Sequence, residues 1–321
     1  MKKFQIILGT LFFQFFFSQE VKDYISYIPK DYKIKFTNNY EQDDFITLKR
    51  NLNIFLIKNI ENGNFGFKNE YILLYQKISD KQYYICSNGE YYWLVEKYKN
   101  IKKHYFLGLQ RSYCFLKPNK KDFIKDGIIQ LDIVFLSGNL MVSSSEFDDF
   151  KIVKNGIKLS IKLADVKVDT DKDGYNDIFE NYYGLNRLSK DSDGDGIDDL
   201  KDKNPLYKSS NGDYQYIYED ILNKDFSENE IYDYDTIKSY DENLCTINPK
   251  KKIIIVNLKT NTGLMAKIYL ARYDKPFSEI KKIDNSVFHI WVYPNISEKI
   301  QYEYKKTNKG WEKNILNAFI I

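Results

Sequence analysis

Residues 168–180 read V-D-T-D-K-D-G-Y-N-D-I-F-E, and residues 191–206 read D-S-D-G-D-G-I-D-D-L-K-D-K-N-P-L. Counted from Asp169 and from Asp191, both stretches place aspartates at positions one, three and five, glycine at six, and carboxylates at nine and twelve. These carboxylates are Asp169, Asp171, Asp173, Asp177 and Glu180 in the first stretch, and Asp191, Asp193, Asp195, Asp199 and Asp202 in the second.

This spacing suits a hard divalent cation. Calcium takes about six to eight oxygen ligands from carboxylates, backbone carbonyls and water. Alternate carboxylates can curl around the ion, and glycine at position six permits the turn that aims the next carbonyl inward. That carbonyl belongs to Tyr175 in the first stretch and Ile197 in the second. Asp-Gly pairs also mark solvated turns, but turns alone do not require carboxylates at nine and twelve, so we predict two calcium loops.

The tandem loops resemble thrombospondin type 3 repeats of bacterial secreted and surface proteins, which often finish in Asn-Pro as Asn204-Pro205 does here. The resemblance covers residues 166–206 only. It implies that the twelve residues named above are metal ligands. The first loop departs from the pattern because Glu180, rather than aspartate, stands at position twelve, as in an EF-hand loop. The sequence leaves room for only a short helix over 178–183, closed by Gly184.

Charge is concentrated in the same segment. Residues 165–202 carry twelve acidic and five basic side chains, whereas the whole chain has a formal net charge of +3. The remaining charge is mixed in sign and contains no dense basic run. This pattern indicates a local cation site and argues against nucleic acid as a partner.

The N-terminus has the features of an export signal. Lys2 and Lys3 precede an apolar stretch, residues 4–17, that is short for a membrane span. We therefore expect residues 1–18 to be a signal peptide and no transmembrane span after its removal. The protein would then lie in the periplasm, on the cell surface or outside the cell. Export fits calcium, because extracellular calcium modules have dissociation constants of about 10⁻⁴–10⁻³ M.

The sequence predicts a mainly β protein. Residues 19–165 should form an N-terminal antiparallel β domain, residues 166–206 the tandem calcium loops with a short helix, and residues 207–321 a small C-terminal α+β domain. Strands are expected at 71–75, 82–86, 91–96, 104–109, 112–116, 128–136, 150–153 and 157–163, and in the C-terminal domain at 252–258, 266–273, 287–292, 299–304 and 311–321. A helix is expected around 216–223, and tight hairpin turns at 87–90, 261–263 and 308–310.

The three cysteines allow at most one internal disulfide, for which Cys86 and Cys114 are the natural pair. Three buried, unpaired cysteines are an equally good interpretation.

Motifs for catalysis are absent from the sequence: it has no G-x-S-x-G, H-E-x-x-H, P-loop or G-x-G-x-x-G pattern. We name no catalytic residue. His104 and His289 alternate with aromatic residues, as strand positions do, and the sequence indicates no partners for general base catalysis. Aromatic side chains could stack on sugar rings, but core or cross-strand packing explains them more simply; they are Tyr91, Tyr92, Trp93, Trp291 and Tyr293.

The function predicted from these observations is that of an exported, non-catalytic calcium-binding protein, in which calcium rigidifies a central segment between two β-rich domains. A structural, adhesive or envelope-associated role follows, with another envelope protein or a polysaccharide as a possible partner. Two alternatives stay open at this point: an exported glycoside or peptide hydrolase with structural calcium, and a polysaccharide-binding module.

Overall fold

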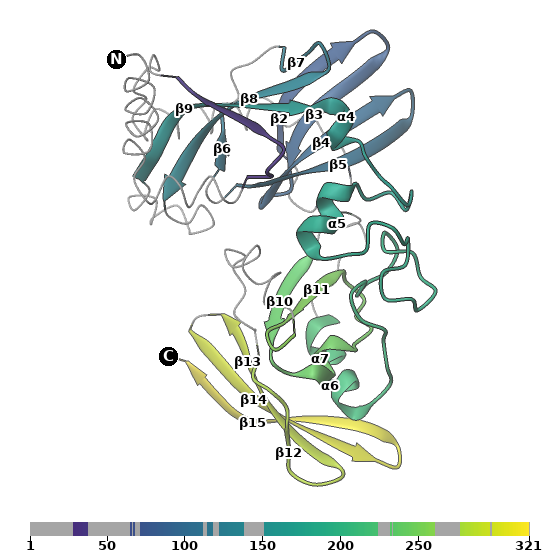
Figure 1. The fold of residues 1–321 in the computed structure, drawn as a ribbon. Coiled ribbons are helices and arrows are strands. Elements are labelled where there is room, and N and C mark those ends of the chain that lie inside the picture. The colour runs from purple at the N-terminus through teal and green to yellow at the C-terminus, as the bar shows by residue number, and fades with distance from the viewer. Residues whose placement is uncertain are drawn as a thin grey trace, which may run out of the picture. The chain divides into compact units, whose positions relative to one another are not determined.

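The structure, a computed structural model, is described for residues 28–37, 65, 67, 71–111, 114–117, 122–137, 151–223, 232, 234–260, 277–295 and 297–320 (Figure 1). The chain forms two compact units, Met1–Tyr182 and Tyr183–Ile321, and each is described by itself. The boundary between them falls inside the predicted calcium segment. The predicted signal peptide, the predicted strand at 266–273 and the predicted turn at 261–263 lie outside the described residues.

The fold is mainly β, as predicted. In the N-terminal unit, four strands form an antiparallel meander: β2 (Tyr71–Ile78), β3 (Lys81–Ser87), β4 (Tyr91–Tyr98) and β5 (Ile101–Gln110). A second antiparallel sheet has the order β1-β9-β8-β6, and β7 pairs with β8. Its strands are β1 (Lys33–Phe36), β6 (Cys114–Leu116), β7 (Ile124–Lys125), β8 (Ile128–Ser137) and β9 (Lys151–Lys162).

The two sheets of the N-terminal unit share one hydrophobic core. Ile85 and Leu94 of the meander belong to the same buried cluster as Leu131 and Leu159 of the second sheet. The meander is also covered on its other face, which explains why residues 91–96 are buried without alternation. Short helices follow β9, namely α4 (Leu163–Val166) and α5 (Asp177–Tyr183), and aromatic residues of α5 pack on this second face.

Strand β9 differs from the two strands predicted at 150–153 and 157–163. It is continuous, but its register against β8 shifts between the pairs Phe135–Lys154 and Ile133–Ile157. Gly156 in this interval has a φ of 69°, a conformation that glycine adopts readily. A bulge inside one strand therefore interrupts the apolar alternation and produces a pattern like that of two strands.

The C-terminal unit combines helices with two small sheets. Helix α6 (Asp213–Leu222) begins directly after Gly212, three residues before the predicted start at 216, and α7 (Glu242–Cys245) is a single turn. Strands β10 (Asp235–Ser239) and β11 (Ile253–Asn257) form a parallel pair. An antiparallel sheet has the order β12-β13-β14-β15, with β12 (Lys281–Lys282), β13 (Val287–Asn295), β14 (Glu298–Thr307) and β15 (Gly310–Ile320).

One face of α6 joins both sheets into a core. Ile217 and Tyr218 of the helix are fully buried in a cluster with Ile255 of β11 and with Phe288 and Ile290 of β13. Apolar residues at helical spacing thus meet β-branched and aromatic residues of the strands.

The predicted hairpins at 87–90 and 308–310 are confirmed. Asn88 accepts hydrogen bonds from the backbone N–H groups of Glu90 and Tyr91 at 3.2 and 2.8 Å, and Thr307 pairs with Gly310 across the β14–β15 turn.

All three cysteines are buried, and Cys86 and Cys114 are not joined by a disulfide. Within the described ranges, none of the helices has the length and apolar character that crossing a bilayer requires.

Candidate metal centre

The aspartates at positions one, three and five converge in both loops. One carboxylate oxygen from each of Asp169, Asp171 and Asp173 lies within 4.8 Å of the others, and the same holds for Asp191, Asp193 and Asp195. Such a cluster of oxygen atoms can hold a hard cation, because calcium binds oxygen ligands at about 2.3–2.6 Å and tolerates irregular geometry.

The loop backbone bends at the same positions in both loops. Position four has a positive φ in each, 65° at Lys172 and 75° at Gly194, and so does position six, 114° at Gly174 and 100° at Gly196. A Cβ atom added at Gly196 would meet nothing within 4 Å, so glycine is favoured there by the backbone conformation and not by lack of space. The sequence predicted the turn at position six but not the one at position four.

The carboxylates of both loops also accept hydrogen bonds from the loop backbone. Asp169 accepts the N–H of Lys172 at 2.7 Å, as Asp191 accepts that of Gly194 at 2.7 Å. The position-five aspartates, Asp173 and Asp195, accept the position-seven N–H at 2.7 and 2.8 Å. These bonds hold the carboxylates on the inside of the turn.

The residues at position nine close each loop. The side chain of Asp177 accepts both the backbone N–H and the hydroxyl of Thr170 at 2.8 Å, and the side chain of Asp199 does the same with Ser192 at 2.9 and 2.6 Å. The backbone N–H of position nine donates to the carbonyl that precedes position one in both loops, at 2.9 and 2.7 Å. Thr170 and Ser192 both place a hydroxyl group at position two, but the sequence did not predict a role for them. The role of Asp177 and Asp199 as ligands stays a prediction.

Position twelve is buried in both loops. Glu180 is 0% exposed and Asp202 is 6% exposed, which is unusual for carboxylates without a bound cation. Asp202 Oδ1 accepts the backbone N–H of Asn204 at 2.9 Å. Its Oδ2 has no hydrogen-bond partner in the part of the chain that the structure describes, and neither has Oδ2 of Asp171 or of Asp193.

The pKa values of these carboxyl groups reflect the crowding. Burial, followed by the charges of Asp195 and Asp202, raises the pKa of Asp193 to about 6. Burial also raises the pKa of Asp202, to which the charges of Asp195 and Asp191 add, and burial raises the pKa of Asp171. A bound cation would remove this penalty because it favours the ionised form of every carboxylate around it.

The predicted carbonyl donors lie in different surroundings. Tyr175 is buried, and its ring stacks on Phe179 with 4.0 Å between centroids. Ile197 is 43% exposed. Because every candidate donor is a carboxylate or a backbone carbonyl, all of the donor atoms are oxygens. Such a set fits calcium better than zinc or copper.

The side-chain amide of Asn204, two residues after the second loop, forms contacts that the sequence did not predict. Asn204, 2% exposed, donates from Nδ2 to the carbonyls of Cys245 and Ile247 at 2.7 and 3.0 Å. Sequence reasoning saw it only as part of an Asn-Pro ending.

The aromatic residues considered as sugar platforms divide into two groups. Tyr91, Tyr92 and Trp93 are each 2% exposed and form part of the core, whereas Tyr293 is 38% exposed. His104 is also buried, beside Phe67 at 5.7 Å between ring centroids.

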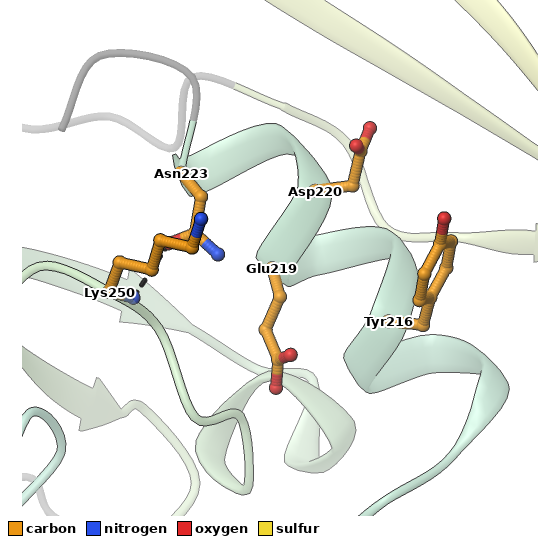
Figure 2. A pocket seen from close by; sticks show the side chains of 5 residues that line it. All are labelled: Tyr216, Glu219, Asp220, Asn223 and Lys250. Atoms are coloured by element: carbon orange, nitrogen blue, oxygen red, sulfur yellow. Dashed lines mark hydrogen bonds between the residues drawn. The ribbon is translucent and has the colours of Figure 1, made fainter.

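A surface hollow of about 340 Å³ beside α6 offers another group of polar side chains, shown in Figure 2. Glu219 and Asp220 leave the helix in different directions. Glu219 accepts the backbone N–H of Asn248 at 2.7 Å, and Asp220 accepts the hydroxyl of Tyr304 at 2.6 Å. Asn223 accepts the backbone N–H of Lys250 at 2.7 Å. These side chains connect α6 and the residue that follows it to neighbouring segments of the same unit.

Comparison with known proteins adds no relative: no protein-family model, curated protein or solved structure matches this chain.

Proposed function

We propose that this protein is an exported calcium-binding protein with a structural rather than a catalytic role, and that at least two calcium ions fill the loops at 169–180 and 191–202. The observation that carries the proposal is the set of inward carboxylate oxygens at Asp171, Asp193 and Asp202 that are inaccessible to solvent and have no hydrogen-bond partner among the described residues. Buried acidic groups of this kind are expensive unless a cation binds them.

Calcium would act on the fold through charge. Twelve acidic side chains within residues 165–202 repel one another, and a divalent ion in each loop would neutralise most of the charge around it. Because the ion would bind only the folded loop, the free energy of calcium binding would add to the free energy of unfolding. The calcium-loaded segment would be compact and resistant to protease.

We also propose that residues 166–206 are related to thrombospondin type 3 repeats. The tandem spacing and the closing Asn204-Pro205 support this relationship. Export is proposed from the pattern of residues 1–18. It is consistent with calcium, which is abundant outside the cell and scarce in the cytosol.

Calorimetric titration of the chelator-stripped protein tests the proposal. Calcium should bind with a stoichiometry of at least two, and Asp173→Asn and Asp195→Asn should each weaken one site. We expect a loss of affinity of about tenfold or more, since removing even a group that only orients a ligand costs about 10–100-fold.

The matched control is Asp198→Asn, which removes a carboxylate of the second loop that pairs with Lys201 rather than joining the aspartate cluster. This variant should titrate like the parent. Absence of binding by the parent at millimolar calcium would refute the proposed function.

A further inference from the structure

The two loops belong to different compact units. Residues 169–180 lie within Met1–Tyr182, and residues 191–202 lie within Tyr183–Ile321. Five of the twelve positions carry the same residue in both loops, but the contacts that fix each loop come from its own unit.

Asn176 fastens the first loop to the meander. This side chain is 2% exposed. Its Oδ1 accepts the backbone N–H of Phe106 at 3.2 Å, and its Nδ2 donates to the Phe106 carbonyl at 2.9 Å and to the Val166 carbonyl at 2.8 Å. The amide thus pairs with β5 as a neighbouring strand would. The same Oδ1 accepts the N–H of Phe179 at 3.3 Å, near the start of α5.

Two further contacts attach the first loop to the same sheet. Lys167, two residues before Asp169, forms an ion pair with Glu96 of β4, which also binds Lys81 at 3.0 Å. Near the C-terminal end of the loop, the ring of Phe179 packs against Trp93 and Phe106, with centroid distances of 5.8 and 5.5 Å. The first loop is held at both ends by β4 and β5.

The second loop is held in the same manner by other elements. Asn204 binds the carbonyls of Cys245 and Ile247, which lie at and just after the end of α7. Lys252 donates to the carbonyl of Leu200 inside the loop. The backbone N–H of Ile253, the first residue of β11, donates to the Lys203 carbonyl at 2.8 Å.

We propose that the two loops are separate calcium switches, each of which stabilises the compact unit to which its buried asparagine binds. This inference rests on the calcium binding proposed above. Asn176 would transmit loading of the first loop to β5. Asn204 would transmit loading of the second loop to α7, and the neighbouring Lys203 carbonyl would transmit it to β11. Both asparagines act as positioning residues, because their side-chain amides bind backbone carbonyls of neighbouring segments.

The size of the expected effect follows from ligand linkage. A ligand that binds only the folded form lowers the equilibrium constant for unfolding. The factor is one plus the ratio of the ligand concentration to the dissociation constant. With calcium at one hundred times the dissociation constant, opening of the attached unit should therefore become about 100-fold rarer. Amides that exchange only through that opening should slow by the same factor.

Hydrogen exchange read by mass spectrometry on the full chain tests the inference. The parent, Asp173→Asn and Asp195→Asn are compared in calcium and in chelator, and peptides covering β4 and β5 report on one unit while peptides covering β11 report on the other. Asp173→Asn should lose the calcium-dependent slowing in β4 and β5 but keep it in β11. Asp195→Asn should show the reverse.

The controls are Asp165→Asn and Asp198→Asn, which remove exposed carboxylates that pair with Lys162 and Lys201 and lie outside the aspartate clusters. Each variant in chelator supplies its own baseline, so a general loss of stability is separated from a loss of the calcium effect. Asparagine keeps the size of the replaced side chain.

Each of the following outcomes would overturn the inference. Either variant could abolish the calcium effect in both units, which would mean one cooperative site. The effect could be confined to peptides of the loops themselves, which would mean that the asparagines transmit nothing. If the parent shows no calcium effect and no calorimetric binding, the proposed function fails and the inference fails with it; binding without unit-specific slowing defeats the inference alone.

Discussion

At the scale of single residues, the fold opposes the positive charge of His104. The side chain is 8% exposed on β5 and lies among the rings of Phe65 and Phe67. Burial, with a smaller contribution from the charge of Lys102, lowers the pKa of His104 from 6.5 to about 4. The neutral imidazole is thus an ordinary member of the core, as alternation with aromatic neighbours in the sequence suggests.

This pKa predicts an acid-sensitive N-terminal unit. Because the folded pKa is below the unfolded one, the unfolded chain binds more protons between pH 6.5 and 4, so stability present above pH 6.5 is lost as the pH falls through that window. The loss should be about 3 kcal/mol. It is measured by denaturant unfolding of the parent and of His104→Gln in chelator, where metal release makes no contribution.

The variant should lose less free energy of unfolding than the parent over the same pH range. Equal pH dependence of the two proteins would contradict the assignment of His104 as a buried neutral group.

The convergence of the aspartates could be predicted from sequence because it is local: their spacing within twelve residues contains most of the geometry. The asparagines that position the loops could not. Asn176 binds Phe106, and Asn204 binds Cys245 and Ile247, and no short-range pattern shows which backbone a distant side chain will meet. The hydroxyl residues at position two could have been noticed, because Thr170 and Ser192 occupy equivalent places.

At the scale of elements, apolar and aromatic runs separated by turn residues predicted the strands of the meander, and turn residues predicted the hairpin at 308–310. Strand predictions failed where the apolar pattern is interrupted and where the strand is mostly polar. The bulge at Gly156 made β9 look like two strands. Strand β10 lies in a stretch that reads as a polar, acidic run, because only Thr236, Ile237 and Ser239 of its residues are buried against the parallel partner. Its strand character depends on that pairing and not on its composition.

The loop closure at position nine gives a prediction at this scale. Thr170→Val removes the hydroxyl that binds Asp177 but keeps the shape of the side chain, and Ser192→Ala does the same for Asp199. Losing one hydrogen bond to a carboxylate costs about 1.5–3 kcal/mol when the bond is buried, and less for the exposed pair at Thr170. We expect calcium affinity to fall by about tenfold in the second loop and by only about threefold in the first, measured by calorimetric titration.

Thr170→Ser, which keeps the hydroxyl, should bind calcium like the parent. If Thr170→Val and Ser192→Ala both bound calcium with unchanged affinity, position nine would have no part in closing the loops around an ion.

At the scale of the whole molecule, the acidic segment contrasts with the rest of the chain. Residues 165–202 hold twelve of the forty-five acidic side chains, and the boundary at Tyr182 and Tyr183 assigns one cluster of them to each compact unit. A cation in each cluster would relieve repulsion in both units. The stability of the entire protein would then depend on calcium, although the ions contact only a small part of it.

The most direct test is calorimetric unfolding of the intact protein in millimolar calcium and again in excess chelator. At calcium well above the dissociation constants, each unit should gain about 2–3 kcal/mol, which corresponds to a rise in its transition temperature of roughly 5–10 °C for units of this size. Unfolding profiles that superimpose in calcium and chelator would contradict the account.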